Sequence, residues 1–361
     1  MSGGFADILE SIGKKDRGKL ESKIPAWAGV EIEVPSSLNF QQCSGQSAAL
    51  YKASLISENC RIADLTGGLG VDSWAFTLRA AALWYNERDE ALRFAVERNF
   101  ARLGIGNVVF NSFDIDAASA GWQEELRAFR PDVVYLDPAR RSDSGRKVFL
   151  LEECSPDVLT LMPLLLEIAP RVFIKVSPMA DLTMLRRRLG SKLEELHVVG
   201  SGGECKEVLC LCARSAGFRG IVLFEDGCTF NSSWGSAPGA CSNNNLDAEA
   251  GTSGELLFVP SAAMTKSGMG PGICLMEYSE ELQHFGKYWQ VVENLPFASS
   301  VIKTLRRRYP QADVSSKGLP VSAEELRKKL GVKPGGPVQI IACNLSGDRR
   351  LMVCEPLNSA D

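Results

Sequence analysis

Between Cys60 and Ala213 the chain alternates short apolar runs with longer amphipathic segments. The apolar runs are rich in Val, Ile, Leu and aromatic residues, which is typical of buried β-strands. The segments between them repeat apolar residues at roughly three- to four-residue spacing, which favours helices with one buried face. This alternation predicts an α/β fold, with a mostly parallel, doubly wound sheet covered by helices on both faces.

The pattern divides the chain into four parts. Residues 1–58 are expected to be a helical N-terminal segment, 59–215 the sheet domain, 216–255 a Gly-, Ser- and Asn-rich linker or loop, and 256–361 a small α/β domain. In the sheet domain the predicted strands are 61–64, 82–87, 107–111, 132–136, 171–176, 195–199 and 208–212, and the predicted helices are 72–82, 89–103, 119–129, 156–169 and 182–189. In the last domain, strands are expected at 256–259 and 338–342 and helices at 300–309 and 322–330.

Composition and charge exclude several classes of protein. The chain is 45% apolar and 23% charged with a net charge of −4, so any affinity for nucleic acid must come from a local patch. Eleven cysteines accompany only two histidines and no Cys-x-x-Cys pair, which predicts reduced thiols and no metal site. Without a signal peptide or a membrane-length apolar run, we expect a cytoplasmic protein with no membrane contact.

Three glycines and two acids surround the turn after the first predicted strand. Gly67, Gly68 and Gly70 would let a ligand approach the backbone at the edge where open α/β sheets bind ligands. Asp64 and Asp72 would repel a pyrophosphate but suit a cation. S-adenosylmethionine carries an ammonium and a sulfonium, and its carboxylate could bind the helix N–H groups. Alternatively, Asp72 only stabilises the first turn of the helix.

Two further acids follow the next strands at useful distances. Glu87 lies 20 residues after Gly67, where an acid could accept both ribose hydroxyls. Asp114 follows the third strand and could contact the adenine amine. The candidate cofactor-binding residues are therefore Asp64, Thr66, Gly67, Gly68, Gly70, Asp72, Glu87 and Asp114.

The fourth strand ends in Asp137-Pro138, which predicts the catalytic position. A carboxylate and rigid backbone carbonyls there could hold the hydrogens of a planar amine and direct its lone pair at a methyl group. The candidate catalytic residues are Asp137, Pro138 and Arg140, and the candidate substrate-binding residues nearby are Arg141, Lys175 and Ser177. Alternatively, the arginines are solvated and Lys175 only extends to water at its strand end.

These motifs resemble those of a known enzyme class. Asp64-Leu-Thr-Gly-Gly-Leu-Gly70, Glu87 and Leu136-Asp-Pro-Ala-Arg140, in this order, are similar to class I S-adenosylmethionine-dependent methyltransferases. The sequence of these motifs is most similar to that of a bacterial family whose methyltransferase domain precedes a THUMP-like domain. It is more distantly similar to that of RNA guanine-N2 methyltransferases of the trimethylguanosine synthase type. The resemblance implies a Rossmann-like sheet of about seven strands with the last one antiparallel, and an RNA-capturing C-terminal domain.

Two positions depart from that resemblance. Nucleobase amine methyltransferases often have Asp/Asn-Pro-Pro followed by an aromatic ring that stacks on the base, but here Ala139 and Arg140 stand in those places. Stacking must then come from the Arg140 guanidinium or from elsewhere, or the target is not a base. Family members also tend to have an acid where Phe113 stands, one residue before Asp114.

The C-terminal part carries a local excess of positive charge. Residues 303–333 contain nine basic and three acidic residues, a balance of +6 that includes Arg306, Arg307 and Arg308. Such a patch is typical of contact with a phosphate backbone, although charged helices are often merely solvated. Ser322 and Glu325 have the spacing of a helix capping box.

Together, these features predict an S-adenosylmethionine-dependent methyltransferase that modifies RNA at a nucleobase exocyclic amine. Two alternatives remain open at this point. The acceptor could be a protein or a small molecule, or the chain could be a non-catalytic module that binds S-adenosylmethionine and RNA. A dinucleotide-dependent dehydrogenase is disfavoured because Ser73 replaces the third glycine of its fingerprint.

Overall fold

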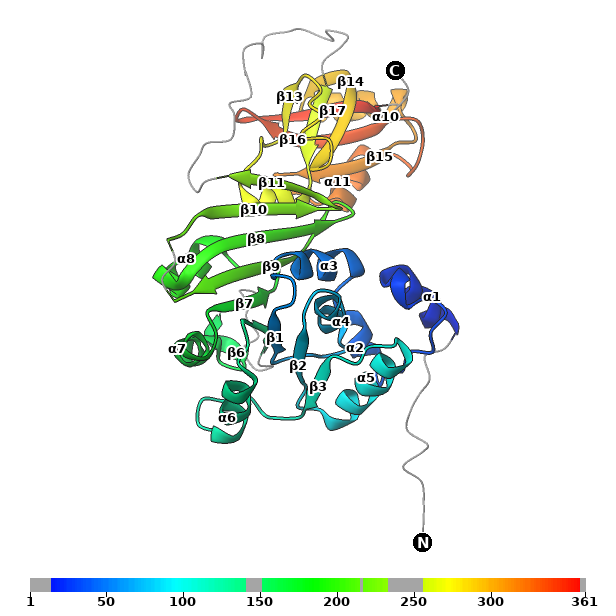
Figure 1. The fold of residues 1–361 in the computed structure, drawn as a ribbon. Coiled ribbons are helices and arrows are strands. Elements are labelled where there is room, and N and C mark those ends of the chain that lie inside the picture. The colour runs from blue at the N-terminus through cyan, green and yellow to red at the C-terminus, as the bar shows by residue number, and fades with distance from the viewer. Residues whose placement is uncertain (1–13, 141–150, 215–216, 233–255, 358–361) are drawn as a thin grey trace. The chain divides into compact units, whose positions relative to one another are not determined.

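The computed structural model describes residues 14–140, 151–214, 217–232 and 256–357. The chain divides into two compact units, Met1–Trp234 and Gly235–Asp361. Each unit is built on its own sheet, as the ribbon in Figure 1 shows. Within the described ranges, no helix combines the length and apolar character that crossing a membrane requires.

The first unit contains a nine-stranded sheet in the order β11-β10-β8-β9-β7-β4-β1-β2-β3. Seven of these strands match the predicted set: β1 (Arg61–Asp64), β2 (Ala82–Asn86), β3 (Val108–Asn111), β4 (Val133–Leu136), β7 (Arg171–Val176), β8 (Leu193–Ser201) and β9 (Glu204–Ala213). β9 runs antiparallel to both β7 and β8, whereas β3, β2, β1, β4 and β7 pair in parallel. The predicted doubly wound sheet with an antiparallel last strand is confirmed.

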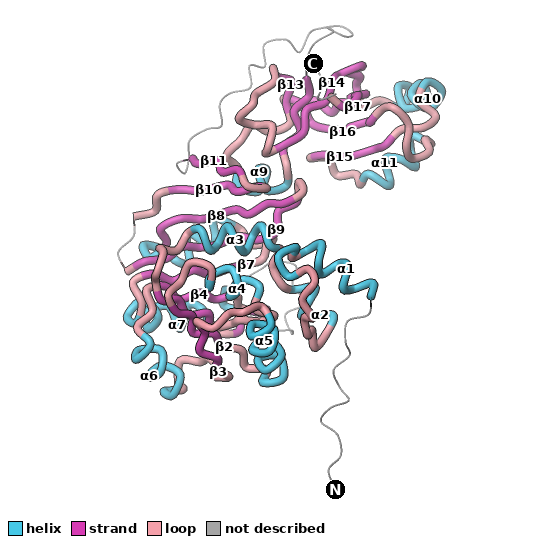
Figure 2. Tube along the Cα trace, turned by 45° about the vertical axis from the view of Figure 1, so that its right-hand side comes forward, coloured by secondary structure: helices cyan, strands magenta, loops and turns pink. Residues whose placement is uncertain are grey.

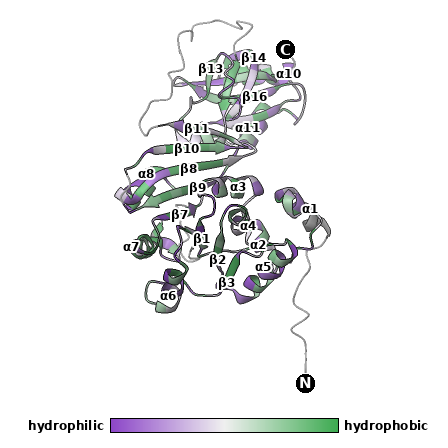
Figure 3. Cartoon of the chain, viewed as in Figure 1, coloured by the Kyte–Doolittle hydropathy of each residue, from purple (hydrophilic) through white to green (hydrophobic). Residues whose placement is uncertain are grey.

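The helices between these strands follow the predicted order. They are α4 (Val71–Thr77), α5 (Glu90–Arg102), α6 (Ala120–Phe129), α7 (Val158–Ile168) and α8 (Leu182–Leu189), drawn in cyan in Figure 2. α4 ends earlier than expected, because residues 78–81 turn into β2 and the Ala81 N–H bonds to the Cys60 carbonyl at 2.8 Å. The central strands that these helices flank are largely hydrophobic (Figure 3), which is expected of a sheet buried on both faces.

Two strands extend the sheet beyond the predicted seven. β10 (Gly220–Glu225) pairs in parallel with β8, and β11 (Cys228–Ser232) pairs antiparallel with β10. The prediction of a linker over 216–255 is therefore wrong at 220–232. Asp226 and Gly227 form the tight turn at positive φ, 44° and 96°, and such an Asp-Gly pair between strand-forming residues is a hairpin signal.

The N-terminal segment belongs to the first unit rather than standing apart from it. Its elements are α1 (Lys14–Lys23), a 3-10 turn (Pro25–Trp27), α2 (Ser37–Gln42) and α3 (Gln46–Ser54). Ile24 and Trp27 are buried in the same core as Ile62 of β1, and the Trp27 ring meets Trp74 edge-on with centroids 6.0 Å apart. The segment therefore completes the core around the glycine turn.

The second unit is a six-stranded sheet in the order β13-β12-β14-β17-β16-β15. Its strands are β12 (Leu256–Pro260), β13 (Cys274–Met276), β14 (Gly286–Pro296), β15 (Asp313–Lys317), β16 (Gln339–Leu345) and β17 (Asp348–Pro356). Its helices are α9 (Ala262–Ser267), α10 (Ser299–Arg308) and α11 (Ala323–Leu330). The capping box of Ser322 and Glu325 is present at the start of α11, as predicted.

A short β-ribbon flanks the end of β4. β5 (Ala139–Arg140) pairs antiparallel with β6 (Cys154–Ser155), which follows the 3-10 turn Leu151–Glu153. The ribbon brings Ser155 and Pro156 to the carboxyl edge of the sheet, where they line the pocket described next.

Candidate active site

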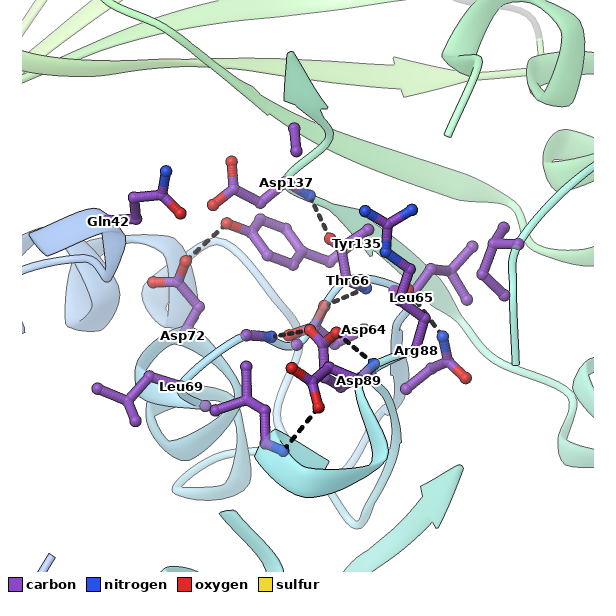
Figure 4. A pocket seen from close by; sticks show the side chains of 18 of the residues that line it. Gln42, Asp64, Leu65, Thr66, Leu69, Asp72, Arg88, Asp89, Tyr135 and Asp137 are labelled. Atoms are coloured by element: carbon purple, nitrogen blue, oxygen red, sulfur yellow. Dashed lines mark hydrogen bonds between the residues drawn. The ribbon is translucent and has the colours of Figure 1, made fainter. Parts of the chain in front are cut away.

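A pocket of about 350 Å³ lies at the carboxyl ends of β1, β2 and β4 in the first unit (Figure 4). Its volume is within the range of small-molecule sites. The strand order reverses around β1, so the pocket occupies the switch point where open α/β sheets bind ligands. Its walls include the glycine turn 64–72, residues 86–89 and 113–115, Asp137, Lys175, and, from the N-terminal segment, Asn39, Gln42, Cys43 and Ser44.

The glycine turn is shaped by two close approaches of backbone to side chain. A Cβ on Gly67 would lie 2.0 Å from the Tyr85 ring, and a Cβ on Gly70 would lie 2.8 Å from Val96. Gly68 and Gly70 adopt positive φ values of 54° and 79°, which glycine tolerates best. The Tyr85 hydroxyl donates to the Gly68 carbonyl at 2.6 Å, so the turn is held against β2.

Glu87 is tied to this turn at the rim of the pocket. One carboxylate oxygen accepts from the Gly68 N–H at 3.0 Å and the other from the Asp89 N–H at 2.9 Å. A carboxylate oxygen has two lone pairs, so both oxygens can accept further hydrogen bonds from hydroxyl groups. Asp114 lines the pocket with Phe113 and is exposed.

Asn86 is a structural residue of the site that the sequence motifs did not identify. Its buried amide donates to the carbonyls of Leu65 and Phe113, at 3.1 and 3.0 Å, and accepts from the Phe113 N–H at 2.8 Å. It therefore joins the loops after β1 and β3. An asparagine at the end of the second predicted strand was the available signal.

Asp64 is buried under the glycine turn and bonds to two of its residues. It is 1% exposed, and its two oxygens accept from the Thr66 N–H at 3.0 Å and the Ser73 hydroxyl at 2.6 Å. Burial raises the pKa of Asp64 to about 7, although these two hydrogen bonds act to lower it. Both oxygens of the carboxylate are thus used within the turn, although Asp64 also lines the pocket.

Asp72 is also satisfied by the protein itself. It accepts from the Ser44 hydroxyl at 2.9 Å and the Tyr135 hydroxyl at 2.7 Å, and it lies 2.9 Å from the fully buried Lys52 ammonium. Burial alone would raise the pKa of Asp72, but Lys52 and Lys175 lower it below the ordinary value. Its negative charge is matched by Lys52 and Lys175, whereas the hydrogen-bond partners of Asp64 are neutral.

Asp137 lines the same pocket and is held by two bonds. Its N–H donates to the Thr66 hydroxyl at 2.6 Å, and its carboxylate Oδ2 accepts from the Lys175 ammonium at 2.5 Å. Figure 4 shows Thr66 reaching up to Asp137, with Gln42 of the N-terminal segment nearby. The Asp137 side chain is 37% exposed, so this acid faces the pocket.

Lys175 is more strongly paired than a strand-end lysine that extends to water. Besides Asp137, its ammonium lies 3.9 Å from Glu207 and 4.0 Å from Asp72. Burial alone would lower the pKa of Lys175, but the three carboxylates raise it above the ordinary value, so the side chain stays charged. Lys52 and Glu207, which complete this network, were not among the candidate site residues.

The remaining candidates are distributed differently. Pro138 is buried and does not line the pocket, and neither does Ser177, whose hydroxyl accepts from the Met179 N–H at 3.2 Å. The backbone of Arg140 belongs to β5, while its side chain and the whole of Arg141 lie outside the described residues. Within the described ranges, no cluster of His, Cys, Asp and Glu has the arrangement of a metal site.

The three arginines of the basic patch lie in the second unit. Arg306, Arg307 and Arg308 form the last turn of α10 and are exposed. Arg308 pairs with Glu293 at 2.6 Å. The buried face of α10 and α11 is formed by leucines, including Leu305, Leu326 and Leu330.

Comparison with a solved structure from Porphyromonas gingivalis W83, titled "putative methyltransferase", gives a TM-score of 0.78 at 26% identity. The match covers 95% of this chain and 89% of that one. The sequence model of the family described as THUMP domain-like matches residues 286–356, the span of β14 to β17. The chain has the class I methyltransferase fold and a THUMP-like domain at its C-terminal end. The resemblance seen in its motifs is thereby confirmed.

Other solved structures are similar to parts of the chain. A "putative RNA methyltransferase" from Pyrococcus horikoshii has 15% identity and a TM-score of 0.35, covering 57% of this chain and all of that one. A "putative methyltransferase" from Streptococcus mutans in complex with SAH has 13% identity and a TM-score of 0.33, covering 46% of this chain and 96% of that one. No curated protein sequence matches the chain.

Proposed function

We propose that this protein is an S-adenosylmethionine-dependent methyltransferase that acts on RNA, at an exocyclic amine of a nucleobase. The observation that carries the proposal is that the glycine turn, Glu87 and Asp137 all line one pocket at the switch point of the sheet. The fold and the P. gingivalis structure, which is titled as a methyltransferase, support the reaction class.

The cofactor half of the pocket suits S-adenosylmethionine. Gly67 and Gly70 let the turn pack closely against Tyr85 and Val96, Gly68 faces open space where the amino-acid end would lie, and Glu87 can accept from ribose hydroxyls. The charged residues of the lining are the acids Asp64, Asp72, Glu87, Asp89, Asp114 and Asp137 and the cations Arg88 and Lys175, and this excess of acids favours a ligand with net positive charge. When bound, S-adenosylmethionine supplies an electrophilic methyl group on its sulfonium.

Asp137 is the residue that we assign to the acceptor. An exocyclic amine whose hydrogens are held by a carboxylate presents its nitrogen lone pair in a fixed direction. Because the methyl group is already activated, most of the catalysis is orientation and charge stabilisation. Thr66 fixes the backbone of Asp137 and Lys175 fixes its carboxylate, so this residue is well suited to that task.

RNA is the acceptor class that the second unit favours. Residues 303–333 have a balance of +6 in a chain whose net charge is −4. The basic residues include the exposed last turn of α10 (Arg306, Arg307 and Arg308) and the last turn of α11 (Arg327, Lys328 and Lys329). Clustered, exposed cations of this kind bind phosphate backbones through counterion release. They lie within the THUMP-like match at residues 286–356.

The proposal is tested by transfer of a tritiated methyl group from S-adenosylmethionine into total RNA from cells that lack this protein. We expect label in RNA, a single methylated nucleoside by mass spectrometry, and loss of label with Asp137→Ala. Label in protein but not in RNA would support the protein methyltransferase alternative. Tight S-adenosylmethionine binding by calorimetry without transfer to any acceptor would support the non-catalytic module.

The RNA-binding part has a separate test with a matched control. α8 and α10 both carry three consecutive arginines in their last turn, Arg186–Arg188 and Arg306–Arg308. We expect Arg307→Glu to weaken RNA binding and to reduce the slope of log K against log salt by about 1 or more. Arg187→Glu, on the sheet domain, should leave both unchanged. Equal effects of the two reversals would show that the charge of α10 has no special role.

A further inference from the structure

Five ionisable side chains form a continuous network from the core of the first unit to the pocket. Lys52 bridges Asp72 and Glu207 at 2.9 and 2.6 Å, and Lys175 reaches the same two carboxylates at 4.0 and 3.9 Å. Lys175 then contacts Asp137 at 2.5 Å. Exposure increases along this path, from 0% for Lys52 to 12% for Lys175 and 37% for Asp137.

We propose that Lys175 is a positioning residue for methyl transfer, which orients the Asp137 carboxylate toward the acceptor amine. This inference rests on the proposed function. It differs from the sequence-based expectation that Lys175 binds a substrate phosphate or ribose. An ammonium that already faces three carboxylates has little capacity left for a phosphate, whereas it can fix the one carboxylate that faces the pocket.

The charge balance of the network supports this role. Two lysines face three carboxylates, so the fully ionised network carries a charge of −1. Asp72 and Glu207 are nearly buried, with side chains 9% and 4% exposed, and are neutralised from two sides by Lys52 and Lys175. Asp137 is the most exposed of the three carboxylates and lies at the pocket wall, with Lys175 as its 2.5 Å partner. Because Lys175 occupies Oδ2, Oδ1 is the oxygen that is left for the hydrogens of the amine.

The position of Lys175 is itself restrained by Asp72 and Glu207, on the buried side of its ammonium. Asp72 is held by Ser44, Tyr135 and Lys52, and Glu207 is bonded to Lys52. A cation anchored in this way cannot follow Asp137 if the carboxylate rotates, so the pair has a preferred geometry. A misplacement of about 1 Å in a reacting group can cost roughly 100-fold in rate. This precision is what Lys175 contributes.

Lys175 neither donates nor accepts a proton in the reaction that it assists. The amine lone pair forms the new N–C bond while the C–S bond of S-adenosylmethionine breaks and its electron pair returns to sulfur. The nitrogen then loses one proton to solvent. Asp137 accepts a hydrogen bond from the amine throughout, and Lys175 remains protonated, in keeping with its raised pKa.

The test compares Lys175→Ala and Lys175→Met with the wild type and with Lys206→Ala, which replaces an exposed lysine of β9 that pairs with Glu204. We expect kcat for methyl transfer to fall roughly 30- to 100-fold in both Lys175 variants, while the Kd for S-adenosylmethionine stays within about threefold. Propylammonium, which replaces the atoms lost in Lys175→Ala, should restore kcat several-fold, and the neutral isostere 1-propanol should not. Lys206→Ala should behave as wild type.

The possible outcomes separate this inference from the proposed function. If the wild type transfers no methyl group to RNA, protein or small molecules, the proposed function itself fails. If the wild type is active and the Lys175 variants keep its kcat, Lys175 is not a positioning residue. A rise in the KM for RNA at unchanged kcat leads to the same conclusion. The same conclusion follows if neither variant binds S-adenosylmethionine even with propylammonium, because the lysine would then be purely structural.

Discussion

The buried ion network makes a quantitative prediction about Lys52. Replacing it with Met removes a cation that is 0% exposed and leaves Asp72 and Glu207 with only the more distant Lys175. At an effective dielectric constant of about 20, unit charges 2.6 to 2.9 Å apart attract each other by roughly 6 kcal/mol. The variant loses two such attractions, but it no longer pays the desolvation penalty of the buried Lys52 ammonium, and its two carboxylates can lower their own penalty by taking up protons. We therefore expect a net destabilisation of about 3–5 kcal/mol.

The measurement is urea unfolding of the full chain followed by tryptophan fluorescence. Four of the six tryptophans (Trp27, Trp74, Trp84 and Trp122) are buried in the first unit, so the signal reports mainly on the unit that contains Lys52, whereas Trp289 lies in the second unit. The control is Lys206→Met, which removes a pair of the same 2.6 Å length whose side chains are 46% and 73% exposed. Because exposed pairs contribute little to the free energy of unfolding, this variant should have the same urea midpoint as the wild type.

The reasoning would be refuted if Lys52→Met were no more destabilising than Lys206→Met. A second variant identifies the cause of the cost. If the penalty comes from an orphaned carboxylate, adding Glu207→Gln to Lys52→Met should recover part of the lost stability. If the double variant is instead less stable by the full sum of the two single changes, packing of the lysine stem dominates over charge.

Three further predictions concern the turn, the buried acid and the added strand. Gly67→Ala should destabilise the first unit by roughly 1–3 kcal/mol and weaken S-adenosylmethionine binding in calorimetry, because its Cβ would meet the Tyr85 ring, whereas Gly106→Ala, in open space, should do neither. The pKa of Asp64 is raised to about 7, so between about pH 4 and pH 7 the folded state holds a proton that the unfolded state has lost, and stability decreases as pH rises through this window. Asp64→Asn removes this contribution, so the wild type should gain roughly 2–3 kcal/mol of stability over the variant at pH 5 relative to pH 8 in urea unfolding, and a pH-independent difference would contradict the raised pKa. Phe224→Ala should cost about 3 kcal/mol in the same assay, because the ring is buried and stacks on Tyr51 at 3.9 Å, and a neutral result would mean that β10 is not part of the folded sheet.

Several elements could be predicted because their signal is local. The strand at 171–176 and the helix at 182–189 have the predicted bounds, since a buried strand and an amphipathic helix show their periodicity within a few residues. β14 was missed because its many partly exposed positions give no compact apolar run, and β17 was missed although Leu351–Cys354 is a buried apolar run, because charged residues flank it on both sides. β10 and β11 were hidden by the glycine- and serine-rich composition around them, despite the Asp226-Gly227 turn.

The sequence by itself determined the class of fold, the glycine turn and the position of Glu87 and Asp137 at one edge of the sheet. In alternating βα units the carboxyl ends of parallel strands meet at the same edge, so chain order alone brings these residues together. The tertiary structure decided which charges are available to a ligand. Lys52 and Glu207 are 155 positions apart, yet folding places Lys52 2.6 Å from Glu207 and 2.9 Å from Asp72. Folding also gives Asp137, the most exposed acid of the network, its contact with Lys175. Periodicity is a property of neighbours along the chain, whereas the state of a buried charge depends on partners that only folding brings within 3 or 4 Å.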